Sequence, residues 1–116
     1  MLAEGVVIVR LAKDSDRLLV LMYKSFLTAR KAGVSRGEAK HIGSSHRIQG
    51  SLLPKEARED IDELCRELDR AGCLVCQYAD DTIWDSYLSD AGIIMLENRF
   101  KDGLVGVLSF LAQFIP

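Results

Sequence analysis

Two cysteines and two histidines are the residues in this 116-residue chain whose types and spacing suit metal or redox chemistry. Cys73-x-x-Cys76 has the spacing of a metal knuckle or of a redox pair. No second Cys or His pair stands at zinc-finger spacing, because His41 and His46 lie far upstream. If the segment after Cys73 forms a strand, the odd separation also turns the two thiols to opposite faces. We therefore expect structural thiols, no metal and no cofactor.

The motifs of common enzymes are missing from the sequence. It contains no Gly-rich phosphate loop, no G-x-S-x-G elbow and no H-E-x-x-H. His41 and His46 are five residues apart, which suits neither one helical face nor a known metal pair, so both are interpreted as polar surface residues. The carboxylates are spread along a solvated helix face, whereas acid–base catalysis needs them paired in an apolar pocket. The sequence predicts no catalytic residue and no enzyme.

Phosphate binding is the chemistry that the charge distribution suggests. Residues 30–58 carry seven cations against two acids, or +5, and residues 59–90 carry two against ten, or −8. A basic segment next to a helix N-terminus suits the DNA backbone, because phosphate neutralisation and the helix dipole both favour it. The residues that we predict for a DNA-binding patch are Arg36, Lys40, His46, Arg47, Gln49, Lys55 and Arg58.

A long helix is expected first, because apolar residues recur at helical spacing over residues 16–32. Ser15 or Asp16 offers its N-cap, and Gly33 ends it. Gly5–Val9, before this helix, is ambiguous between a short strand and the start of a preceding helix.

A short second helix is expected from Arg36 to about Ile42. Ser35 and Glu38 form a capping box at its start, because the hydroxyl and the carboxylate are three residues apart. Residues 43–50 are polar and flanked by glycines, so they are predicted to form a loop.

The third helix is predicted to begin at Pro54, which suits the first helical position, and to end at Gly72. Its apolar residues lie on one face at steps of four, three, four and three. Leu74–Tyr78 and Thr82–Leu88 favour strands joined by an Asp80-Asp81 turn, which predicts a β-hairpin.

Two helices are expected after the hairpin, one capped by Ser89 and running through Phe100, and one over Leu104–Ile115. The last segment is too short to span a membrane, and a peripheral membrane contact is disfavoured because it has no basic face. It is apolar almost all round, so it needs a second surface, which predicts a homodimer; the alternative is a closing helix buried in a monomer. The residues predicted for the dimer are Leu104, Val107, Leu108, Leu111 and Phe114.

Three helices followed by a hairpin match the plan of the winged helix-turn-helix. Leu53–Gly72, with its L-x-x-x-G ending, and Tyr87–Glu97, close to Y-x-L-T-x-x-G-x-x-x-L-E, resemble small bacterial and phage winged-helix proteins, nearest to the YjcQ-like group. The resemblance covers roughly residues 16–102. It implies a mainly α fold with a small antiparallel hairpin, in one domain over residues 1–116, with a core at 16–88 and a C-terminal helical extension at 89–116.

The resemblance implies a DNA-binding protein, a possible transcriptional regulator that acts as a dimer. The alternative is a winged-helix module that binds another protein and not DNA, because seven acids outnumber four cations in the third helix and the hairpin adds Asp80, Asp81 and Asp85. The odd number of cysteines and the absence of a recognisable secretion signal predict a cytoplasmic location.

Overall fold

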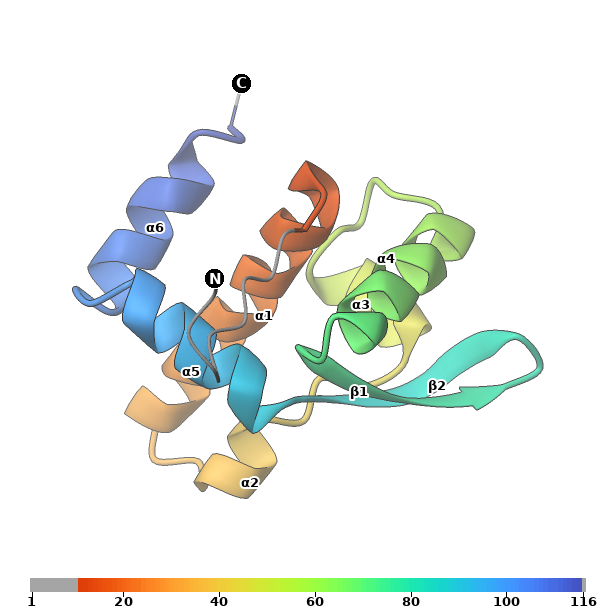
Figure 1. The fold of residues 1–116 in the computed structure, drawn as a ribbon, viewed down its shortest axis with the longest axis horizontal. Helices are drawn as coiled ribbons and strands as arrows, with labels where there is room; N and C mark the ends of the chain where they lie inside the picture. Colours follow the sequence, from red (N-terminus) through yellow and green to blue (C-terminus); the bar gives the residue numbers. More distant parts are fainter. Residues whose placement is uncertain (1–10, 116) are drawn as a thin grey trace, which may run out of the picture.

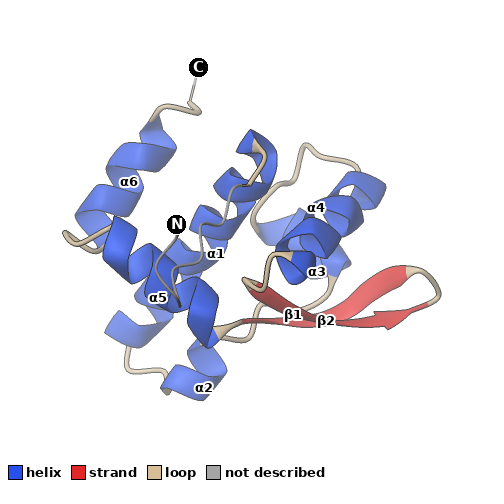
Figure 2. Cartoon of the chain, viewed as in Figure 1, coloured by secondary structure: helices blue, strands red, loops and turns tan. Residues whose placement is uncertain are grey.

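The computed structural model describes residues 11–115 as a mainly helical fold with one two-stranded antiparallel hairpin (Figures 1 and 2). The predicted Gly5–Val9 element lies outside these residues. The elements are α1 (Lys13–Lys31), α2 (Arg36–Ala39), α3 (Ser45–Ser51), α4 (Arg58–Arg70), β1 (Leu74–Ala79), β2 (Thr82–Leu88), α5 (Asp90–Arg99) and α6 (Leu104–Ala112).

Helix α1 is the central element, and it packs against α2, α4, α5 and α6. Figure 1 shows it between α6 on one side and the α3–α4 pair on the other. Its inward face is fully buried and includes Leu18, Leu19 and Met22. Ile93 of α5, Leu96 of α5 and Val107 of α6 belong to the same apolar cluster. The C-terminal helices therefore share the core of the preceding elements.

The start of α1 differs from the sequence prediction. The helix begins at Lys13, with Ala12 at the N-cap, so neither Ser15 nor Asp16 caps it. Ser15 is buried within the first turn, and Asp16 accepts two hydrogen bonds from the Arg99 guanidinium, at 2.7 and 3.0 Å. Arg99 thus engages Asp16, and the buried Ser15 hydroxyl has no hydrogen-bond partner within the described residues.

Helix α2 confirms the predicted Ser35 cap but ends early, and α3 corrects the predicted loop. The Ser35 hydroxyl accepts a hydrogen bond from the Glu38 N–H, and α2 follows directly. It ends at Ala39 and not near Ile42, because the backbone of the next residues bonds to β2. Residues 43–50 are not a loop, because α3 begins at Ser45 with the Ser44 hydroxyl accepting from the Arg47 N–H at 3.1 Å. Seven residues with one fully buried apolar side chain, Ile48, show too little periodicity to reveal a helix.

The start of α4 is a second correction. Pro54 does not open the helix; it lies in a turn, and α4 begins four residues later at Arg58. The chain turns because Leu53 is buried and accepts a hydrogen bond at its carbonyl from the Glu56 N–H. Ile61 and Leu68 then face the core, as the apolar spacing predicted, whereas Ala57 is exposed before the helix and Leu64 is half-buried. Cys65, which the predicted stripe of 57, 61, 64, 68 and 71 left out, is buried.

The predicted hairpin is confirmed, and its irregularity has a clear effect. Asp80 and Asp81 form its turn with φ of 51° and 61°, the conformation of a two-residue hairpin loop. The register shifts between Gln77 and Tyr78, which is a β-bulge. In a regular strand Ile83 and Tyr87, four residues apart, would point to the same face. Because the bulge interrupts the alternation of β2, Ile83 is buried and Tyr87 is exposed.

Residues 40–43 pair with the other side of β2, an arrangement that the sequence did not reveal. His41 forms a single antiparallel bridge with Tyr87. The Leu88 N–H donates to the Lys40 carbonyl at 2.8 Å, and the Ile42 N–H donates to the Ser86 carbonyl at 2.9 Å. The spatial order is therefore this short segment, β2 and β1.

Helices α5 and α6 confirm the two predicted C-terminal helices. The Ser89 hydroxyl accepts from the Gly92 N–H at 2.9 Å, as its predicted role as a cap requires. Gly92 is needed there, because a Cβ atom would lie 2.6 Å from the Cys73 carbonyl oxygen. Helix α6 ends at Ala112, three residues before the predicted end.

Candidate functional site

Arg36 and Lys40, two of the seven predicted DNA-binding residues, are engaged by α5. The Lys40 ammonium donates to Asp90 at 2.9 Å, and Arg36 lies 3.9 Å from the same carboxylate. The Arg36 guanidinium also lies over the Phe26 ring at 5.6 Å. The hydrogen bond and the charge of Lys40 lower the pKa of Asp90. These two cations therefore anchor α2 to α5.

The three candidates on α3 point in different directions. The Arg47 side chain covers Gly43 and lines an open groove with His41 and residues of α1. The Gln49 amide donates to the Glu56 carbonyl at 2.7 Å and ties α3 to the following turn. His46 is exposed. Gln49 is therefore used within the fold, whereas the side chains of His46 and Arg47 make no hydrogen bond or ion pair within residues 11–115.

Lys55 and Arg58 are exposed beside the N-terminus of α4. Lys55 lies in the turn before the helix, and Arg58 is its first residue. Within residues 11–115, neither cation takes part in an ion pair. The predicted basic patch is thus weakened, because Asp90 engages Arg36 and Lys40, while Arg47, Lys55 and Arg58 stay exposed without an ion pair within residues 11–115.

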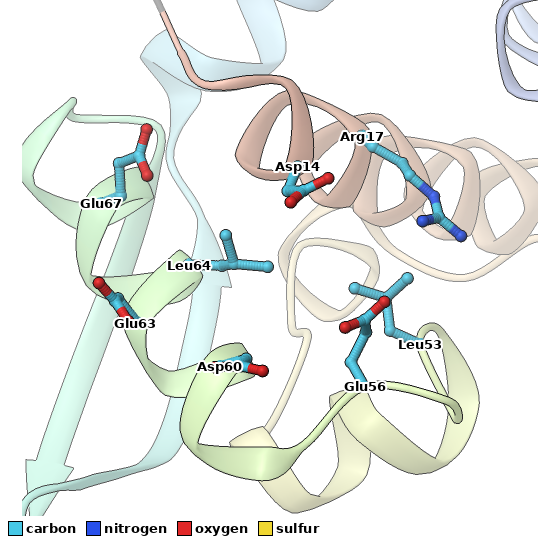
Figure 3. Close-up of a pocket in the computed structure, with 8 residues that line it drawn as sticks. All are labelled: Asp14, Arg17, Leu53, Glu56, Asp60, Glu63, Leu64 and Glu67. Atoms are coloured by element: carbon cyan, nitrogen blue, oxygen red, sulfur yellow. The ribbon is translucent and has the colours of Figure 1, made fainter. Parts of the chain in front are cut away.

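An acidic groove lies directly beside Lys55 and Arg58, and Figure 3 shows it between α1 and α4. The groove has a volume of about 350 Å³. Its floor contains Leu53 and Leu64, and Arg17 is its single cation. Five carboxylates line it, from Asp14, Glu56, Asp60, Glu63 and Glu67.

The carboxylates of the groove are largely unpaired. No ion pair within the described part of the chain engages any of the five. Glu67 accepts the backbone N–H of Ala12 at 3.1 Å, which fixes the start of α1 against α4. We call the surface formed by Glu56, Glu59, Asp60, Glu63 and Glu67 the acidic face of α4.

The hairpin extends the negative charge. Asp80 and Asp81 are exposed at its turn, and the Arg66 guanidinium is occupied by a hydrogen bond to the Asp81 carbonyl. Residues 54–88, which span the turn, α4 and the hairpin, carry four cations against ten acids, or −6. An electrostatic field of this sign repels phosphate and attracts cationic groups.

Asp62 is a buried residue that positions the site and that sequence reasoning missed. Its carboxylate accepts hydrogen bonds from the Thr82 hydroxyl at 3.0 Å and from the Ile83 N–H at 3.1 Å. The Ser45 hydroxyl lies 3.0 Å from the Thr82 hydroxyl. One carboxylate therefore ties α4 to β2 and, through Thr82, to α3. Its place among the exposed acids of α4 hid this role, since only its position opposite the hairpin distinguishes it.

The cysteines occupy the environment of structural thiols. All three are free, and Cys65 and Cys73 are buried. Burial raises the pKa of Cys65 to about 12, with the nearby Cys76 and Asp62 adding to the effect. Burial also raises the pKa of Cys76 to about 12. Both thiols stay protonated at neutral pH, and the thiolate is the form that attacks or binds metal.

His41 is more than a polar surface residue. Its Nε2 lies 2.6 Å from the Asp85 carboxylate, and its ring lies 4.8 Å from the Tyr87 ring. Burial raises the pKa of Asp85, but the hydrogen bond and charge of His41 and the Ser86 N–H together lower it. His41 thus fixes residues 40–43 to β2 by its side chain as well as its backbone.

The five predicted dimer residues differ in exposure. Val107 is fully buried against the core, so it is unavailable to a partner. Leu104, Leu111 and Phe114 are half-buried, and Leu108 is 46% exposed. Val105, which the prediction left out, is 70% exposed on the same helix. The exposed side of α6 therefore includes Leu108 from the predicted set and Val105, which lies next to the predicted Leu104.

Neither a metal centre nor a membrane-spanning helix is found in the described residues. Between residues 11 and 115, no group of three or more His, Cys, Asp or Glu side chains is placed to hold a metal ion. None of the helices there combines the length and apolar character needed to cross a bilayer. Comparison of the chain with protein-family models, with curated proteins and with solved structures gave no match.

Proposed function

We propose that this domain is a winged helix. The support is the order of its elements: α1, the short α2, a bridged segment at residues 40–43, α3, a turn, α4 and the β1–β2 hairpin. In that plan α3 and α4 are the helix-turn-helix, α4 is the exposed reading helix and the hairpin is the wing. The segment at 40–43 supplies the third strand that closes the small sheet beside β2.

We propose that the domain binds a protein and not DNA through this part of its surface, without catalysing a reaction. The single observation that carries the proposal is the acidic face of α4. A winged helix that reads DNA places its third helix among phosphates, and cations supply much of its affinity. Here residues 54–88 carry a charge of −6, and the wing turn presents Asp80 and Asp81.

A basic protein segment is the partner that this surface fits best. The groove offers five carboxylates around the apolar side chains of Leu53 and Leu64. Carboxylates at the rim steer a cationic partner and select against anionic ones, and the apolar floor accepts the aliphatic part of a Lys or Arg side chain.

Binding of a labelled hexa-arginine peptide tests the protein proposal against DNA. We expect the wild-type chain to bind the peptide, and a mixed-sequence DNA duplex to bind far more weakly at about 150 mM salt. The variant Glu56→Gln/Asp60→Asn/Glu63→Gln removes three charges from the groove and is expected to weaken peptide binding about tenfold. Glu38→Gln, an exposed acid on α2, is the matched control and leaves the affinity unchanged. Equal binding by both variants would contradict the assignment of this face.

DNA binding is the second candidate, and Lys55 with Arg58 is the observation that favours it. Both cations are exposed at the N-terminus of α4, where the helix dipole also favours phosphate. A transcriptional regulator would use them as its phosphate contacts. Tight duplex binding that falls steeply with salt and is lost in Lys55→Glu/Arg58→Glu would replace the protein proposal with this one.

We also propose that the chain has itself as a partner, in the form of a homodimer. Helix α6 supports this, because it carries no charged residue and exposes large apolar side chains. A reducing compartment such as the cytoplasm suits the three free cysteines, and we propose that the domain works there. Sedimentation at micromolar concentration tests the dimer, and a single 12.9 kDa species would exclude it.

A further inference from the structure

The exposed side of α6 is a continuous apolar seam. Val105, Leu108, Ala112 and Ile115 follow one another at steps of three, four and three. Val105 is 70% exposed, Leu108 46% and Ile115 74%, and Ala112 is also exposed. The first three lie on α6 at the spacing of the contact positions of two paired helices, and Ile115 follows three residues after the helix ends. We call these four residues the α6 seam.

The groove beside the seam continues the apolar surface. It has a volume of about 280 Å³ and lies between α1 and α6, with Leu21, Leu111 and Phe114 among its lining residues. Arg17 and Lys24 of α1 stand at its rim, and the Arg17 guanidinium lies 5.3 Å from the centre of the Phe114 ring. These cations disfavour a basic partner, whereas the uncharged α6 of a second copy meets no repulsion there.

The area agrees with a dimer of ordinary size. From their exposures and typical side-chain areas, the seam and groove present roughly 450 Å² of apolar surface per copy, which corresponds to roughly 750 Å² per copy for an interface about 60% apolar. Stable complexes bury about 800 Å² on each partner. A two-fold axis suits such a surface, because the same residues then serve both copies.

We propose that α6 packs against α6 of a second copy along the α6 seam, with the α1–α6 grooves at the edges of the contact. This assignment rests on the proposed homodimer and is independent of the acidic face of α4. The acidic faces lie across α1 from the seam (Figure 1), although Arg17 lines the groove on each side of α1. Two such faces on one particle would bind a partner with two basic segments more tightly than one face does.

Leu108→Glu is the disruptive test, measured by sedimentation equilibrium. We expect wild-type chains to sediment at about twice 12.9 kDa, and the variant to dissociate at least about 100-fold more readily, because each copy then places a charge in a contact that is otherwise apolar and the two charges repel across the two-fold axis. Leu108 is half exposed in the monomer, so the fold, checked by circular dichroism, is retained. Ile94→Glu on α5 is the matched control, since Ile94 is 54% exposed outside the seam and its substitution leaves the dimer intact.

Val105→Cys gives a positive test that does not depend on loss of folding. Under mild oxidation we expect this variant to form covalent dimers through the seam. Val75→Cys on the hairpin, at a residue 54% exposed, is expected to form few. If the dimer persists in Leu108→Glu and no cross-link forms at position 105, the chain self-associates through another surface and the α6 seam is not the interface. If the wild-type chain is a monomer, both the homodimer and the seam are wrong. Binding of hexa-arginine tests the acidic face of α4 separately in either case.

Discussion

Helices α4 and α6 both pack on α1, yet they expose opposite kinds of surface. Nine of the thirteen residues of α4 are charged, and α6 has no charged residue. The apolar residues of α4 are confined to one stripe that faces the core, so its outer face is polar and exposed to water. Helix α6 buries Val107 and leaves Val105, Leu108 and Ile115 in solvent. Exposed charge is ordinary for a monomer, whereas a run of exposed large apolar side chains marks a contact.

The difference separates two kinds of interaction surface. In the proposed function, the acidic face of α4 would select a partner by charge, with its strongest effect on specificity and on the rate of encounter. The α6 seam has no charged residue, so a proposed dimer through it would be stabilised by area removed from water. The four predictions that follow test this division, from the largest expected effect to the smallest.

The largest effect is expected from Ile61→Ala in α4. Ile61 is fully buried between α4 and the core, and its truncation is expected to lower the free energy of unfolding by about 3 kcal/mol. Val107→Ala in α6 is the comparison, with a loss of about 2 kcal/mol, because valine loses less volume and α6 packs mainly on α1. Urea denaturation measures both. A larger loss at Val107 would mean that α6, and not α4, is the better anchored helix.

The next effect is expected from Asp62→Ala. The substitution leaves the Ile83 N–H and the Thr82 hydroxyl without their shared acceptor, which is expected to destabilise the fold by about 2 kcal/mol. Glu63→Ala, one residue along on the exposed face, is expected to change stability by less than about 0.5 kcal/mol. Thermal unfolding of the two variants distinguishes an acid that holds the hairpin from one that only faces solvent. Equal melting temperatures would show that Asp62 does not stabilise the contact between α4 and the hairpin.

Salt is expected to act on the two surfaces in opposite ways. Raising the NaCl concentration screens exposed charges, so hexa-arginine binding at the acidic face of α4 is expected to weaken about tenfold between low and high salt. The dimer through α6 contains no ion pair in its seam and is expected to be unchanged or slightly stronger. Fluorescence anisotropy and sedimentation follow the two equilibria. A dimer that dissociates in high salt would place charged contacts in its interface.

The smallest effect is expected from Gly106→Ala in α6. A Cβ atom at this position would lie 3.4 Å from the nearest atom of Phe100, so it fits with little movement. Alanine favours the helix over glycine, and we expect a gain of about 0.5 kcal/mol in the free energy of unfolding. The contrasting variant is Gly92→Ala in α5, where a Cβ would lie 2.6 Å from the Cys73 carbonyl oxygen and must destabilise. Stabilisation by both would contradict the packing at Gly92.

The sequence predicted most of the fold, and it missed elements whose local signal is weak. The hairpin, the serine N-caps at Ser35 and Ser89 and both C-terminal helices depend on residues close together in the chain, so their patterns were readable. Helix α3 is too short for periodicity, and the start of α4 depends on the burial of Leu53. The pairing of residues 40–43 with β2 joins segments more than forty residues apart in the chain.

The candidate site was harder to predict than the fold. The charge imbalance of residues 54–88 was visible in the sequence, but the fate of each charge was not. In the sequence Arg36 and Lys40 are available for phosphate, but in the structure both lie beside Asp90. In the sequence Asp62 resembles its exposed neighbours, but in the structure it accepts hydrogen bonds from Thr82 and Ile83.

The sequence by itself determined which helices are amphipathic, where the hairpin turns and that α6 carries no charge, because side-chain type and spacing are properties of the chain. Only the tertiary structure decided which acids and cations are used internally, which side of α6 is exposed and where the acidic groove forms. The physical reason is that a charge or an apolar side chain acts on what lies within a few ångströms of it. For this chain those neighbours come from α1, α4, β2 and α5, which are distant in sequence and close only after folding.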